Sequence, residues 1–125
     1  MPLAWHADDL AILEFSEFGT VFTINDAVVN FRLSDQNITG KREDMVIKNS
    51  ATFDFYYYLL NDKSKHFNAA QQEILFSKIE KSYLNDKKNS YFWLKLTKIY
   101  LGRFKLKSFT LLLYKAISQG FRFKK

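Results

Sequence analysis

The sequence predicts a single α+β domain, in which a small antiparallel sheet is followed by three helices and a terminal β-hairpin. The chain has 125 residues and is 47% hydrophobic, which suits one domain with a packed core. Its apolar residues alternate at first, then follow helical spacing, then alternate again. We therefore divide the chain into an N-terminal extension, a sheet, a helical part and a hairpin, at residues 1–20, 21–48, 50–104 and 108–125.

The predicted sheet consists of short apolar segments, VFTI, AVVNFRL, NIT and MVIK, separated by turn-forming residues. Asn25-Asp26 favours a tight turn because both residue types tolerate positive φ. Phe31 and Leu33 alternate with polar neighbours, as expected for an antiparallel strand with one buried face.

The first predicted helix begins after Asn49-Ser50, which is a favourable N-cap pair, and ends at Asn61-Asp62. Four of its side chains share one face at i, i+3, i+4 and i+7, and are therefore predicted to be buried. These are Phe53, Tyr56, Tyr57 and Leu60.

The second predicted helix begins at Asn68, with Gln71 three residues later in the pattern of a capping box. Its predicted inward residues are Ala70, Ile74, Leu75 and, near the end, Ile79. A polar loop from about Asn85 to Asn89 follows.

The third predicted helix is capped by Ser90, runs to about Arg103, and is apolar almost all round. Two registers fit this pattern, and periodicity alone leaves both open. One buries Phe92, Leu96, Ile99 and the stem of Arg103; the other buries Leu94, Thr97, Leu101 and Phe104.

The last segment is predicted to form a hairpin, with FTLLLYKAI as one strand, Ser118-Gln119-Gly120 as the turn and FRFKK as the other strand. A sheet, short helices joined by polar connections and then a basic hairpin are typical of a winged helix-turn-helix.

The charge of the chain is strongly divided. Residues 1–77 carry 6 Lys/Arg and 11 Asp/Glu, whereas residues 78–125 carry 13 Lys/Arg with only Glu80 and Asp86. This division favours a nucleic acid as the partner of the C-terminal half. An acidic protein partner, or a solvated surface without a partner, remains an alternative.

From Val21 to Lys125 the sequence resembles the DNA-binding domain of OmpR/PhoB-type transcriptional regulators, particularly the ToxR/CadC-like branch. The resemblance rests on LLLYKAISQGFRF, with its Gly-aromatic-basic-apolar ending, and on TFDFYYYLLNDKSKHFNAAQQEILFSKIE. The family usually has Leu-Arg in its recognition helix, where this chain has Ile99-Tyr100 with Arg103 one turn later. The resemblance implies a promoter-binding regulator, and a membrane partner only if the native chain continues into a transmembrane segment.

In the resembling fold, the third helix enters the major groove and the hairpin touches the minor groove or the backbone. Arg103, Lys87 and Lys88 would then hold phosphates, while side chains of the third helix would reach base edges. Core packing or a protein interface is the alternative for Tyr91 and Trp93. The residues assigned to DNA are Lys87, Lys88, Ser90, Tyr91, Trp93, Lys95, Thr97, Lys98, Arg103, Lys115, Ser118, Gln119 and Arg122.

No enzymatic motif, cofactor site or metal site is predicted. The chain has no cysteine, which suits a reducing cytoplasm, and His6 and His66 lie far apart in the sequence. A rival interpretation is a protein-interaction module, such as an immunity or inhibitor protein, that uses an aromatic surface. The apolar excess of the third helix, at Trp93, Leu94 and Leu101, would also suit a homodimer or a partner regulator.

Overall fold

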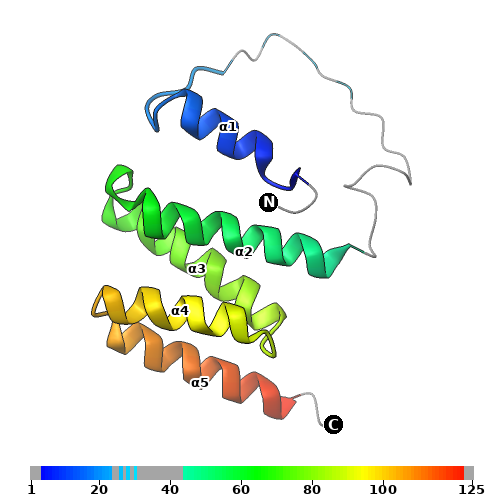
Figure 1. Cartoon of the computed structure of the whole chain (residues 1–125), viewed down its shortest axis with the longest axis vertical. Helices are drawn as coiled ribbons and strands as arrows, with labels where there is room; N and C mark the ends of the chain where they lie inside the picture. The colour runs from blue at the N-terminus through cyan, green and yellow to red at the C-terminus, as the bar shows by residue number, and fades with distance from the viewer. Residues whose placement is uncertain (1–3, 24–25, 27, 29, 31–43, 123–125) are drawn as a thin grey trace. The chain divides into compact units, whose positions relative to one another are not determined.

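The computed structural model describes residues 4–23, 26, 28, 30 and 44–122, with side chains up to residue 118. Its regular elements are all helical, and the described residues contain no strand (Figure 1). The helices are α1 (Ala7–Phe15), α2 (Met45–Asp62), α3 (Ala69–Asn85), α4 (Ser90–Gly102) and α5 (Leu106–Arg122), with a 3₁₀ turn at Ser64–His66.

The predicted α+β winged helix-turn-helix is therefore wrong. The predicted strand MVIK forms the first turn of α2, and the predicted hairpin is α5 up to Arg122. The apolar run of that hairpin contains a helical face, because Phe109, Leu112, Leu113 and Ala116 follow at i, i+3, i+4 and i+7. An apolar segment of this composition could form either a strand or a helix. In this chain it forms a helix, whose apolar face packs against the other helices.

The remaining sheet predictions have no support in the described residues. Residues 21–23 have no regular structure, while Asn25 of the predicted turn and the Phe31–Leu33 alternation lie outside the described residues. The N-terminal extension, predicted without any element, contains α1.

The chain divides into two compact units, residues 1–55 and 56–125, which we call the N-terminal and the C-terminal unit. The boundary falls within α2. By sequence, residues 1–55 contain 4 Lys/Arg and 9 Asp/Glu, and residues 56–125 contain 15 Lys/Arg and 4 Asp/Glu. The two units are therefore of opposite net charge.

In the N-terminal unit, the ring of His6 joins the start of α1 to α2. Nδ1 of His6 lies 2.8 Å from Oδ2 of Asp9, and Nε2 lies 3.0 Å from Oγ1 of Thr52. The ring also stacks on Phe55, with centroids 4.6 Å apart. None of the residues of α1 is buried, so its contact with α2 through His6 is made at the edge of the helix.

Helix ends in the C-terminal unit follow the predicted caps with one exception. α2 ends at Asp62 as predicted. The capping box at the start of α3 is present, because Oδ1 of Asn68 accepts from the Gln71 amide at 2.9 Å and Oε1 of Gln71 accepts from the Asn68 amide at 2.8 Å. The exception is α4, whose N-cap is Asn89 rather than Ser90.

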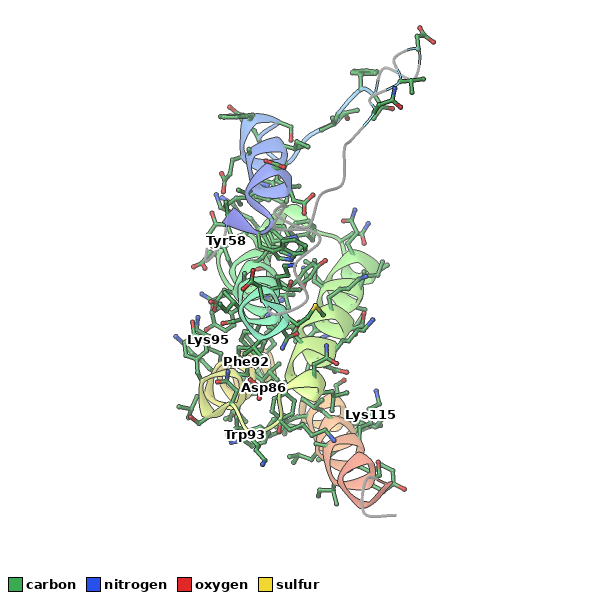
Figure 2. The ribbon with its side chains drawn as sticks, turned by 90° about the vertical axis from the view of Figure 1, so that its right-hand side faces the viewer. Tyr58, Asp86, Phe92, Trp93, Lys95 and Lys115 are labelled. Carbon is green, nitrogen blue, oxygen red and sulfur yellow. The ribbon has the colours of Figure 1, made fainter. Side chains whose placement is uncertain are left out.

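Consecutive helices of the C-terminal unit run in opposite directions and form two layers. The C-terminal part of α2 lies in one layer with α4, and α3 lies in the other with α5 (Figures 1 and 2). The inward face of α3 carries Leu75, Phe76, Ile79 and Tyr83. The predicted inward residue Ile74 is instead 57% exposed, and Ala70 is also exposed.

A continuous series of rings connects α3, α4 and α5, and we call it the aromatic column. Tyr83 packs on Trp93, Trp93 on Phe109, Phe109 on Tyr100 and Tyr100 on Phe76, with successive centroids 5.9, 5.4, 5.3 and 5.2 Å apart. Tyr100 is completely buried. Ring pairs at such distances add to the free energy of burial, so the column holds the three helices in register.

The aromatic column selects one of the two predicted registers of α4. Leu96 and Ile99 are buried with Phe92, at 0%, 4% and 1% exposure. The rival set faces outward, since Leu94, Leu101 and Phe104 are 67%, 51% and 88% exposed. The first predicted register is therefore confirmed.

This register predicts opposite outcomes for two leucines that are two residues apart. Leu96→Ala should lower the free energy of unfolding by about 3 kcal/mol, because it opens a cavity in the core. Leu94→Ala should change it by less than about 0.5 kcal/mol, because the side chain is mostly exposed. Urea denaturation followed by circular dichroism measures both, and equal effects would contradict this register.

Candidate functional site

The structure gives several of the predicted DNA contacts a role in packing. Nζ of Lys87 donates to the Ala116 carbonyl of α5 at 3.0 Å, and Nζ of Lys115 lies 3.8 Å from Oε2 of Glu80 on α3. Trp93 belongs to the aromatic column. Trp93 lies on α4 and Lys115 on α5 (Figure 2).

Arg103 joins the end of α2 to α3 and α4. Its guanidinium donates to Oε1 of Gln72 at 2.7 Å and to the carbonyl of Leu60, and it lies 5.8 Å from the ring centroid of Phe76. Leu60 lies in the last turn of α2, where carbonyls have no partner within the helix. Arg103 therefore caps α2.

Lys95 lies between two tyrosine rings on the side of α4 that faces α2 (Figure 2). Its Nζ is 4.4 Å from the ring centroid of Tyr57 and 4.2 Å from that of Tyr91, and it donates to the hydroxyl of Tyr91. A lysine held by two rings and a hydroxyl is already bound within the protein. It is poorly placed to reach a base edge.

The other predicted contacts lie before α4, on α4 and on α5. Lys88, Ser90, Tyr91 and Lys98 are exposed. The hydroxyls of Thr97 and Ser118 donate to carbonyls of their own helices, Trp93 and Lys115, at 2.9 and 3.2 Å. The backbones of Gln119 and Arg122 lie in α5, and their side chains lie outside the described residues.

Exposed apolar side chains lie on the outward sides of α4 and α5 and on the turn between them, and we call this set the apolar stripe. On α5, Tyr114 and Ile117 lie two and three turns after Leu106, so they continue the same side of the helix. The six residues are 51–88% exposed. They are Leu94, Leu101, Phe104, Leu106, Tyr114 and Ile117.

Two exposed lysines, Lys98 and Lys107, flank the apolar stripe. Lys98 lies four residues after Leu94 and three before Leu101, and Lys107 lies seven residues before Tyr114, so both lysines share the outward side. By sequence, residues 87–125 contain eleven Lys/Arg and no Asp/Glu. The stripe thus belongs to a segment of the sequence whose charged side chains are all basic.

A groove of about 240 Å³ lies between α3 and α5, over the hydroxyl of Tyr100. Glu73 pairs with Lys105 and Glu80 with Lys115 across it, and Tyr100 donates to Glu80. Its remaining lining residues are Phe76, Ser77, Ser108 and Leu111. The carboxylates and lysines of this groove pair with one another. These ion pairs therefore connect α3 to α5 rather than leaving charges free for a ligand.

Sequence reasoning missed the α5 half of the apolar stripe because it treated that segment as a strand. The signal that could have found it is the helical spacing of Phe109, Leu112, Leu113 and Ala116, which leaves Leu106 and Ile117 beside the buried face. The α4 half was anticipated, since Leu94 and Leu101 were proposed as a partner surface.

The described residues offer no group of three His, Cys, Asp or Glu side chains that could hold a metal ion. Within the same part of the chain, every helix is too short or too polar to cross a membrane.

No protein-family model matches the chain, and the searches of curated proteins and of solved structures found no match either.

The role of Arg103 can be tested through protein stability. Arg103→Ala should lower the free energy of unfolding by about 2 kcal/mol, because it leaves Gln72 and the Leu60 carbonyl without their charged donor. Arg103→Lys should recover little of the lost free energy of unfolding, since an ammonium group lacks the planar guanidinium fork that reaches both acceptors. Urea denaturation measures the loss. If Arg103→Ala left stability unchanged but lowered the affinity for DNA, the capping role would be contradicted and a phosphate-binding role supported.

Tyr100 should limit stability at high pH. Burial raises the pKa of its hydroxyl well above the ordinary value of 10.0, and the carboxylates of Glu80 and Glu73 raise it further. The folded chain therefore holds this proton more tightly than the unfolded chain, so stability is complete below about pH 10 and falls above it. Urea midpoints from pH 8 to 12 should decline less for Tyr100→Phe; an identical decline would contradict this cause.

Proposed function

We propose that this protein is an interaction module that binds an acidic, partly apolar protein surface through the apolar stripe. The observation that carries the proposal is the exposure of six large apolar side chains along α4 and α5, at 51–88%, in a segment without a single carboxylate side chain. Contiguous apolar patches are uncommon on proteins that act alone, and they often mark binding surfaces.

The stripe has the composition of an interface centre with a charged rim. Leucine, phenylalanine, tyrosine and isoleucine supply apolar area, and Lys98 and Lys107 flank it. Such lysines accelerate the approach of an acidic partner and disfavour a basic one. This supports binding to a surface that combines Asp or Glu with apolar side chains.

A designed amphipathic peptide tests the proposal. A fluorescein-labelled helix with leucines on one face and glutamates beside them should bind, and the same peptide with lysines in place of glutamates should not. Leu94→Ser with Leu101→Ser should weaken binding by about tenfold or more, measured by fluorescence anisotropy, because both leucines lie in the stripe.

The matched control is Ile74→Ser, which removes an apolar side chain of similar exposure, 57%, from the outward face of α3. It should leave the affinity for the peptide unchanged. Equal weakening by both changes, or tight binding of the lysine peptide, would refute a docking role for the stripe.

Duplex DNA is a second candidate, favoured by the eleven Lys/Arg between residues 87 and 125 and by the exposure of Lys88 and Lys98. This candidate uses the general attraction between lysines and phosphates and involves no wing. It predicts an affinity that falls steeply with salt and is lowered by Lys88→Ala with Lys98→Ala. Gel shifts at two salt concentrations separate it from the first candidate, because the stripe leucines should not affect it.

A further inference from the structure

We propose that the apolar stripe of one molecule binds α1 of a second molecule, so that the chains associate head to tail. This inference rests on the proposed function of the stripe and names its partner. The main observation in its favour is the opposite charge of the segments that contain α1 and the apolar stripe. Residues 1–31 contain five Asp/Glu and no Lys/Arg, whereas residues 87–125 contain eleven Lys/Arg and no Asp/Glu.

The outward face of α1 combines acids with large apolar side chains. Asp8, Ile12 and Phe15 follow at i, i+4 and i+7, so they lie on one side of the helix. All three are exposed, Phe15 at 89% and Ile12 at 53%. Glu17, also exposed, lies two residues after the end of the helix. This face has the composition that the stripe requires of its partner.

The inner side of α1 is anchored separately, so docking would leave its own fold intact. His6 binds Asp9 and Thr52 and stacks on Phe55, and none of these contacts involves Asp8, Ile12 or Phe15. The acids of the outward face are therefore available for an intermolecular contact with Lys98 and Lys107.

Charge also decides between the two ways in which copies could pair. A symmetric dimer through the stripe would bring Lys98 and Lys107 of both copies together, which costs free energy because like charges repel. Pairing α1 with the stripe sets carboxylates against ammonium groups. Because two different surfaces are joined, such a contact closes into a ring, of which a reciprocal pair is the smallest, or continues as an open chain.

Sedimentation velocity of the full chain tests this assembly over about a hundredfold range of concentration. The mean mass should rise with concentration at low salt and fall when salt is raised, since exposed charges are screened. Lys98→Glu with Lys107→Glu should weaken association by about tenfold or more, and so should Asp8→Lys with Glu17→Lys.

The decisive variant carries all four changes, because it restores opposite charges with exchanged signs. Its association should return toward that of the unaltered chain, which a misfolded variant could not do. The matched control is Lys78→Glu with Lys81→Glu, which makes the same charge change at exposed positions of α3 and should leave association unaltered.

Two results would overturn the assembly. One is a monomer at every concentration and salt; if that monomer still binds the acidic peptide, the proposed function stands and only the second copy is excluded as partner. The other is association that persists unchanged in both double variants, which would place the contact elsewhere on the chain.

Discussion

The aromatic column is the constraint on which the C-terminal unit depends. Five rings from three helices pack in series, and one of them, Tyr100, is completely buried and donates its hydroxyl to Glu80. Each ring contributes apolar area, and Tyr100 also requires a polar partner at one point of α3. The column therefore determines both how closely α3, α4 and α5 pack and how each is rotated about its axis.

That rotation creates the outward surface. Once Phe92, Leu96 and Ile99 face the core, Leu94 and Leu101 must face away from it, because α4 turns through 3.6 residues. On α5 the same geometry buries Leu112 and leaves Leu106 and Ile117 exposed. The exposed apolar side chains thus follow from the packing of the core, and their basic surroundings follow from a segment without acidic residues.

Sequence reasoning succeeded where a local signal agreed with the packing and failed where two signals competed. The capping box at Asn68 and the end of α2 at Asp62 were predictable, because each depends on a few neighbouring residues. The segment from Phe109 to Ile117 is apolar enough for a strand or a helix. Which of the two it forms depends on its packing partners on α3 and α4. The internal partners of Arg103 and Lys95 were not predictable, because sequence gives the charge of a residue but not the groups that hold it.

Thiol accessibility tests most directly whether the apolar stripe is a docking surface, because the chain has no cysteine of its own. Single variants Leu94→Cys and Leu101→Cys would be treated with a maleimide at low protein concentration, with and without the acidic amphipathic peptide, and Lys81→Cys on α3 would serve as the reference. We predict rapid labelling of all three in the free chain and slow labelling of Leu94→Cys and Leu101→Cys alone when the peptide is bound. Equal labelling rates with and without saturating peptide at every position would contradict the account.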